Sequence, residues 1–224
     1  SKPMKSKTDI IWLDSAESSN DEARRAIDSL DNLSVIAVRN QTKGRGQGDH
    51  QWCTAPGMNL TFSIALKDLD IIPSEQIAIS QITALSVVDF LYLYGIDANI
   101  KLPNDIYVGT KKICGILIEN SICSSKMTWS IVGVGINVNQ TSFPSSLPNP
   151  TSILLETASH ALSFKRALPE LDLELLLTQF HSIFSGYYYN SLARRDTRKL
   201  AELELIFKSK VVTAINALFC KSGT

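Results

Sequence analysis

Apolar and polar positions along the first part of the chain follow two different periods. Short apolar runs rich in β-branched residues predict strands at 9–13, 33–40 and 59–66. Between the first two runs, residues 18–30 have helical spacing, and Ser19 followed by Glu22 predicts a capping box at the start of that helix. Helix and strand patterns that interleave in this way favour an α/β-type fold.

The middle of the chain carries a longer apolar segment followed by further strand patterns. Pro73 and Gly95 bracket this segment, which is apolar on most faces and predicts a central buried helix. Short β-rich runs separated by turn residues then predict strands at 96–102, 105–108, 113–119 and 129–138. These elements together predict a mixed β-sheet flanked by helices.

The last third of the chain reads mainly as helix after a proline-rich loop over 141–152. Helical spacing resumes from about residue 168, and 193–207 also fits a helix, whereas 210–220 fits either a strand or a helix. We therefore predict one domain over residues 1–189 and a short C-terminal segment over 190–224.

Composition and charge exclude several classes of protein. Lys+Arg and Asp+Glu both number 22, so no overall positive field exists to hold nucleic acid or a membrane surface, and any anion site must be local. The four cysteines form no CxxC pair and no zinc-type spacing with the three histidines, which suits free thiols in a reducing compartment. Neither a signal peptide nor a membrane-spanning apolar run stands out, which predicts a cytoplasmic protein.

The first candidate for chemistry is KGRGQGDHQW at 43–52. Glycines let backbone N–H groups approach a ligand closely, and Arg45 among them indicates an anion. The stretch is no Walker loop, and Asp49 breaks the G-x-G-x-x-G pattern. The alternative interpretation is a surface turn whose glycines serve only its conformation.

The second candidate is KLPNDIYVGTKKICGILIE at 101–119. Asn104 beside Asp105 is suited to holding Mg²⁺ through oxygen ligands, while Lys101 and Lys112 can neutralise phosphate or carboxylate charge. The alternative is a common Pro-Asn-Asp β-turn with lysines that solvate a strand edge.

A third stretch, VGVGINVNQ at 132–140, has two glycines in a strand pattern and ends with Asn137 and Asn139. Glycine inside a strand marks either the close approach of a ligand or backbone, or a bulge. Alone, this pattern does not distinguish a ligand site from a close backbone contact or a bulge.

In this order the stretches resemble the catalytic domain of the biotin protein ligases, which attach biotin to carboxylase carrier domains. The matching blocks are Ser18-Ser19-Asn20, Gln41, Gly44-Arg45-Gly46-Gln47 through Trp52, Lys101 through Asp105, Lys112 through Glu119, and Gly133 through Asn139. The resemblance covers roughly residues 9–156. It implies an α/β (α+β) fold shared with class II aminoacyl-tRNA synthetases, followed by a small SH3-like domain that is shortened or diverged here. Two departures are Leu102 in place of the usual tryptophan and Gly48-Asp49-His50 in the glycine loop.

The resemblance implies an enzyme that activates biotin with ATP and Mg²⁺ to biotinyl-AMP and transfers it to a lysine of a biotin carboxyl carrier domain. It implies catalytic roles for Arg45, Lys101, Asp105 and Lys112, with Asp105 near the metal. The implied biotin-binding residues are Ser18, Ser19, Asn20, Gln41, Gly44, Arg45, Gly46, Gln47, Lys112 and Gly115. The implied ATP-binding residues are Arg45, Trp52, Lys101, Asn104 and Asn137. The glycine loop is expected to close over the adenylate, with Arg45 on phosphate.

Other functions remain open at this stage. A lipoate or octanoate ligase shares the fold, although its arginine-rich, triple-glycine motif followed by histidine is not found here. A homologue that binds biotin without transferring it is a second alternative. Some members act as repressors through an N-terminal winged helix-turn-helix, but only about eight residues precede the first predicted strand, so we expect no DNA binding. The resemblance also allows a homodimer.

Overall fold

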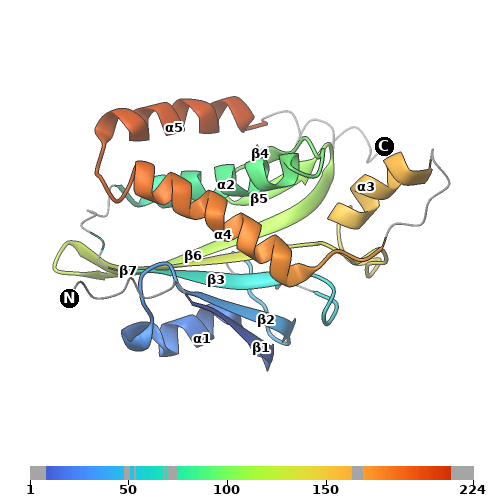
Figure 1. The fold of residues 1–224 in the computed structure, drawn as a ribbon, viewed down its shortest axis with the longest axis horizontal. Coiled ribbons are helices and arrows are strands. Elements are labelled where there is room, and N and C mark those ends of the chain that lie inside the picture. Colours follow the sequence, from blue (N-terminus) through green and yellow to red (C-terminus); the bar gives the residue numbers. More distant parts are fainter. Residues whose placement is uncertain are drawn as a thin grey trace, which may run out of the picture. The chain divides into compact units, whose positions relative to one another are not determined.

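Seven strands form a mixed β-sheet in the computed structural model of the protein, which describes residues 9–47, 51–52, 54–67, 69, 75–162 and 169–212 (Figure 1). The strands are hydrogen-bonded in the order β1-β2-β3-β7-β6-β5-β4. The chain divides into two compact units, Ser1–Gln76 with Leu117–Gly135, and Ile77–Ile116 with Ile136–Thr224. The mixed sheet with flanking helices confirms the predicted fold class.

The first unit is built on the N-terminal strands. Its elements are β1 (Ile10–Ala16), α1 (Ser19–Arg25), the short 3-10 helix η1 (Ile27–Ser29), β2 (Val35–Gln41), β3 (Leu60–Leu66), most of β7 (Lys126–Ile136) and the second half of β6 (Lys111–Cys123). Strand β1 pairs parallel with β2, and β2 pairs antiparallel with β3. Helix α1 lies against these strands (Figure 1) and buries Ala23 and Ile27 in a core with Ile36 and Val38.

The start of α1 differs by one residue from the prediction. Ser18, not Ser19, is the N-cap: its backbone is extended and its Oγ accepts a hydrogen bond from the N–H of Asp21. Ser19 is already helical, and its own N–H donates to the side chain of Gln41 at 2.9 Å. The predicted Ser19–Glu22 capping box is therefore wrong, because a tertiary contact occupies the group that the box would have used.

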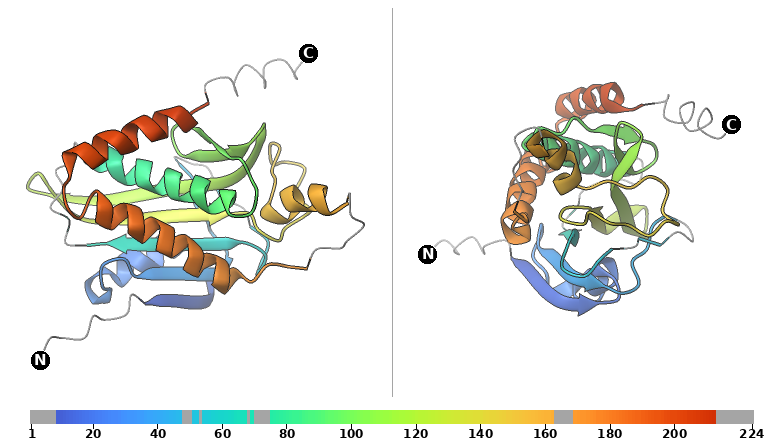
Figure 2. Two further views of the ribbon diagram at one scale, coloured as in Figure 1. Left: turned by 45° about the horizontal axis from the view of Figure 1, so that its top comes forward. Right: turned by 90° about the vertical axis from the view of Figure 1, so that its right-hand side faces the viewer.

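The second unit is mainly helical. It contains α2 (Gln76–Tyr92) apart from its first residue, β4 (Asn99–Lys101), β5 (Asp105–Val108), the first half of β6, α3 (Ile153–Leu162), α4 (Leu173–Asn190) and α5 (Thr197–Lys210). Helix α2 is buried along most of its length, as predicted, and Gly95 follows it with a positive φ of 73°. Helices α2 and α4 lie side by side (Figures 1 and 2), where the rings of Phe90 and Phe180 meet edge to face at 5.9 Å. Pro73 lies outside the described residues.

The C-terminal part of the described chain is helical. Helix α5 confirms a helix in the stretch predicted over 193–207, but it begins at Thr197, after its N-cap Asp196, and ends at Lys210. It buries Leu203 and Phe207, and beyond it the N–H of Val212 donates to the carbonyl of Ile100 at 2.9 Å. The sequence patterns assigned no element to α3, which begins just after the proline-rich loop. The predicted boundary between 189 and 190 stays a prediction. In the part of the chain that the structure describes, no helix is both long and apolar enough to cross a membrane.

Candidate functional site

A buried polar cluster surrounds the start of α1 in the first unit. Ser18, Ser19 and Asn20 are only 3–5% exposed, although all three are polar. The hydroxyl of Ser63 lies 2.7 Å from Ser19 Oγ and also donates to Asn20 Oδ1, while Gln41 Oε1 accepts from the N–H of Ser19. The structure thus brings four of the predicted biotin-binding residues together. Ser63 was missed, although a hydroxyl inside the apolar strand LTFSIAL was a usable signal.

Asn20 connects α1 to β6. Its Nδ2 donates to the carbonyl of Leu117 at 3.2 Å and to Oε1 of Glu119 at 3.0 Å. A Cβ atom at Gly133 would lie 2.5 Å from Asn20 Oδ1 and 2.9 Å from the Leu117 carbonyl oxygen. Glycine is therefore needed at 133 because the Asn20 side chain packs directly onto β7.

The base of the glycine loop is held by main-chain contacts. The N–H of Trp52 donates to the carbonyl of Gly44 at 3.0 Å, and Arg45 forms an isolated antiparallel bridge with Gln51. A Cβ atom at Gly44 would lie 2.4 Å from Nε2 of Gln41. The first glycine of the loop thus leaves room for a side chain of the buried polar cluster.

Trp52 closes the loop by packing onto β7. A Cβ atom at Gly135 would lie 2.4 Å from the indole nitrogen of Trp52. Both glycines of the G-x-G pattern in β7 therefore accommodate protein side chains. Of the other loop positions, Gly46 is half-buried and Gln47 is exposed, while residues 48–50 lie outside the described part of the chain.

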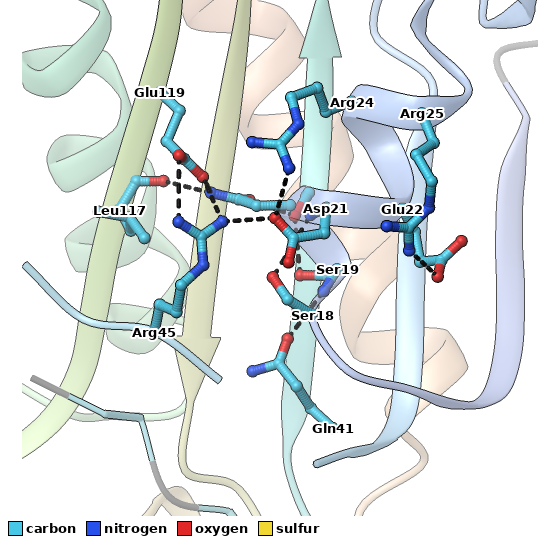
Figure 3. A network of polar contacts seen from close by, with 12 residues as sticks. Ser18, Ser19, Asp21, Glu22, Arg24, Arg25, Gln41, Arg45, Leu117 and Glu119 are labelled. Atoms are coloured by element: carbon cyan, nitrogen blue, oxygen red, sulfur yellow. Dashed lines mark hydrogen bonds and ion pairs between the residues drawn. The ribbon is translucent and has the colours of Figure 1, made fainter. Parts of the chain in front are cut away.

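Arg45 is held by two carboxylates (Figure 3). Its Nη1 and Nη2 donate to the two oxygens of Glu119 at 3.2 and 2.8 Å, and Nη2 also donates to Oδ1 of Asp21 at 2.7 Å. Asp21 accepts a further hydrogen bond from Arg24 at 3.1 Å. The predicted partner of Arg45 was phosphate; in this structure its guanidinium is engaged by protein carboxylates.

The protonation equilibria of this pair favour its charged form. The hydrogen bond with Glu119 raises the pKa of Arg45, against the opposing effect of burial. Burial alone would raise the pKa of Glu119, but hydrogen bonds from Arg45 and Asn20 outweigh it and lower that pKa below its ordinary value. Both groups are therefore charged at neutral pH.

A second group of predicted residues lies together in the second unit. Lys101 is opposite Asp105 across β4 and β5, and Asp105 is opposite Gly115 across β5 and β6. The Nζ of Lys112 lies 3.0 Å from Oδ1 of Asp105, and both side chains are about 30% exposed. The Nζ of Lys101 is 5.3 Å from the ring centroid of Tyr107. The arrangement places two lysines around one carboxylate that solvent can reach.

The donors around Asp105 bear on the expected Mg²⁺. Asp105 is a single carboxylate, and within the described ranges no group of three or more His, Cys, Asp or Glu residues could hold a metal ion. The backbone carbonyl of the neighbouring Asn104 accepts a hydrogen bond from the N–H of Ile116 at 3.0 Å. Because Mg²⁺ is commonly held by one carboxylate together with substrate phosphates, this set fits an ion that arrives with a nucleotide.

The two asparagines after β7 have different roles. Asn137 is 4% exposed and its Nδ2 donates to the carbonyl of Thr151 at 3.0 Å, but its Oδ1 accepts no hydrogen bond from the described residues. A buried acceptor in this state is suited to a ligand donor. Asn139, in contrast, donates to and accepts from the backbone of Leu171 at 3.0 and 2.8 Å, which is a structural role.

Comparison with known proteins identifies one family and several relatives of this chain. The sequence profile of the biotin/lipoate A/B protein ligase family matches residues 12–137. Biotin--protein ligase 1, chloroplastic, of Arabidopsis thaliana is 33% identical over 134 residues, which is 58% of this chain and 36% of that protein. The bifunctional ligase/repressor BirA of Bacillus subtilis is 31% identical over 132 residues, 57% of this chain and 40% of that protein. The matched region thus spans two fifths or less of these relatives.

Solved structures extend the likeness over most of the chain. The biotin protein ligase from Aquifex aeolicus in complex with biotin and ATP matches with a TM-score of 0.71 and 24% identity, covering 91% of this chain and 78% of that one. The Leishmania major enzyme in complex with biotinyl-5-AMP gives a TM-score of 0.70 at 20% identity, covering 93% of this chain and 83% of that one. At these identities the likeness establishes the fold.

Proposed function

Because the chain belongs to the biotin/lipoate A/B protein ligase family, we propose that it is a biotin protein ligase. The reaction has two steps. A carboxylate oxygen of biotin attacks the α-phosphorus of ATP, pyrophosphate leaves, and biotinyl-AMP forms. The amine of an acceptor lysine then attacks the acyl carbon, AMP leaves, and biotin is joined to the acceptor by an amide bond.

The observation that carries this proposal is the buried polar cluster at the start of α1. Biotin presents a ureido group on an apolar ring and chain, so its pocket needs a few fixed hydrogen-bonding groups among apolar walls. Ser18, Ser19 and Asn20 are almost fully buried. Gln41 and Ser63 hold Ser19 by hydrogen bonds, and Ser63 also holds Asn20. Polar groups held in this way are ordered before a ligand arrives, which reduces the entropic cost of binding.

The charges needed for the first step are assigned to the second unit. A biotin carboxylate and an ATP phosphate repel each other, so bringing them together requires positive charge. We assign Lys112 to the carboxylate and the α-phosphate and Lys101 to the other phosphates, with Asp105 and Asn104 near a Mg²⁺ ion bound with the nucleotide. The unmet acceptor of Asn137 is assigned to the nucleotide.

The second step takes its nucleophile from the partner. An acceptor lysine provides the attacking amine, so the ligase itself needs no Ser-His-Asp or Cys-His set. We propose a biotin carboxyl carrier domain as this partner, because a relative from Paracoccus denitrificans, 30% identical over 173 residues, is named biotin--[acetyl-CoA-carboxylase] ligase. Homodimer formation and a cytoplasmic location stay predictions.

Biotin-dependent exchange of pyrophosphate into ATP tests the first step. We expect the purified chain to catalyse exchange with biotin and Mg²⁺ but not with lipoate. Lys112→Gln should abolish it, whereas Lys208→Gln, which removes a surface lysine paired with Glu204 on α5, should leave it unchanged. Exchange with lipoate alone would favour a lipoate ligase. Biotin binding without exchange would indicate a homologue that only binds biotin.

A further inference from the structure

Glu119 has no role in the function proposed above, yet it is hydrogen-bonded both to Asn20 of the buried polar cluster and to Arg45 of the glycine loop. It accepts a hydrogen bond from Asn20 at 3.0 Å. It also accepts hydrogen bonds from both terminal nitrogens of Arg45 at 2.8 and 3.2 Å (Figure 3). Asp21 lies on the other side of the same guanidinium at 2.7 Å. Glu119 and Asp21 together are called the carboxylate clamp below.

We propose that Glu119 is a positioning residue that, with Asp21, holds Arg45 and thereby fixes the glycine loop to α1 and β6. Through its hydrogen bond to Asn20, the Glu119 carboxylate also orients the buried polar cluster, to which we assign biotin binding. Arg45 then acts as the anchor of the loop and not as a ligand for phosphate. This inference rests on the proposed function only for its kinetic consequences.

The charges around Arg45 support the role of an anchor. Arg45 and Arg24 carry two positive charges, and Glu119 and Asp21 carry two negative charges, so the linked group of four is neutral. Three of the hydrogen bonds that Arg45 can donate already go to carboxylates, and the pair with Glu119 is bidentate. A phosphate that approached Arg45 would also meet two carboxylates. The attraction between Arg45 and a phosphate is therefore largely offset.

Glu119 links the glycine loop to Asn20, one of the residues assigned to biotin binding. Arg45 is in the glycine loop and Asn20 is in the first turn of α1, and both are bonded to Oε1 of Glu119. Replacing Glu119 by Gln keeps the shape of the side chain but removes the charge that holds Arg45. The loop and the Asn20 amide should then lose their fixed positions together, which weakens biotin binding more than ATP binding.

A double-mutant cycle on pyrophosphate exchange separates an anchor from a phosphate ligand. We compare Glu119→Gln, Arg45→Gln and the double variant, with Glu22→Gln as a matched control, because Glu22 forms a pair with Arg25 on the solvent side of the same helix. Hydrogen bonds to charged groups are stronger than those between neutral groups, but solvent weakens them where the groups are partly exposed. Each single change should therefore raise the KM for biotin about tenfold. The KM for ATP should stay near that of the wild type. The double variant should be no worse than the poorer single variant.

Limited proteolysis gives a readout that does not depend on activity. Trypsin cleavage after Lys43, at the entrance of the glycine loop, should be faster in Glu119→Gln than in the wild type or in Glu22→Gln, while circular dichroism shows that each variant is folded. Unchanged cleavage and kinetics in Glu119→Gln would overturn the inference. So would tighter ATP binding in Glu119→Gln, or a further loss when Arg45→Gln is added to it. A wild-type chain without exchange would defeat the proposed function, while the cleavage rates would still decide the role of Glu119.

Discussion

Replacing Gly133 by Ala tests whether the packing of Asn20 on β7 holds the buried cluster together. The added methyl carbon would lie 2.5 Å from Asn20 Oδ1 and 2.9 Å from the Leu117 carbonyl oxygen, so the Asn20 amide must move. Overpacking a well-packed site costs roughly 1–3 kcal/mol. A buried amide separated from its partners costs about 1–3 kcal/mol more. The free energy of unfolding should therefore fall by about 2–6 kcal/mol, a large part of the roughly 5–15 kcal/mol of a typical domain.

Urea unfolding measures this loss. All three tryptophans, at 12, 52 and 129, belong to the first unit, so their fluorescence reports on the unit that contains Gly133. With a denaturant slope of about 2–3 kcal/mol per molar, the midpoint should fall by about 0.7–3 M. Gly186→Ala is the matched control: Gly186 lies within α4, nothing lies within 4 Å of its added Cβ, and the change should stabilise the helix by about 0.5–1 kcal/mol, as followed by circular dichroism. If Gly133→Ala unfolds at the wild-type midpoint, the packing argument is wrong.

Three further outcomes are expected. In Gly135→Ala the new methyl would meet the Trp52 indole at 2.4 Å, so the indole should be displaced and tryptophan emission should shift to longer wavelength; an unchanged spectrum would contradict the contact. Burial raises the pKa of the Cys114 thiol, so iodoacetamide at pH 8 should label exposed Cys123 but not Cys114, as peptide mass spectrometry can show. The pKa of folded Glu119 is lowered, so its ionic contribution to stability is present above the ordinary glutamate pKa of about 4.3 and is lost as the pH falls through the folded value. The stability difference between wild type and Glu119→Gln should therefore shrink in urea titrations below about pH 4; a difference that persists there would show that charge is not its cause.

Sequence patterns predicted the elements that depend on local periodicity. The strands and the long buried helix α2 follow directly from runs of apolar residues, and the end of α2 follows from Gly95, which adopts a positive φ. Helix α3 was not predicted because it begins immediately after a loop with three prolines, where local signals favour irregular structure. Its start is capped by Ser152, whose Oγ accepts from the N–H of Leu155 at 3.2 Å.

The candidate site was predicted less completely, because its key contacts join residues far apart in the chain. Four residues of the buried polar cluster were identified and Ser63 was missed. The first turn of α1 was also assigned one residue too late, since Gln41 binds the N–H of Ser19. The glycines of β7 were interpreted as space for a ligand or backbone, or as a bulge. They make room for Asn20 and Trp52, and no local pattern carries that information. Glu119 lay within a matched block, but its two partners could be identified only from the fold.

The distance in sequence between Arg45 and Glu119 has a consequence for synthesis of the protein. The two residues are 74 positions apart, and Asn20 and Leu117 are 97 positions apart. At a ribosomal rate of roughly 5–20 residues per second, the glycine loop emerges about 4–15 seconds before the carboxylate that anchors it. During that interval Arg45 and the polar residues of α1 have neither their β6 partners nor the β7 surface. The contacts that join the buried polar cluster and Arg45 to β6 and β7 are therefore expected to form late in synthesis, although the residues of the cluster itself are made first.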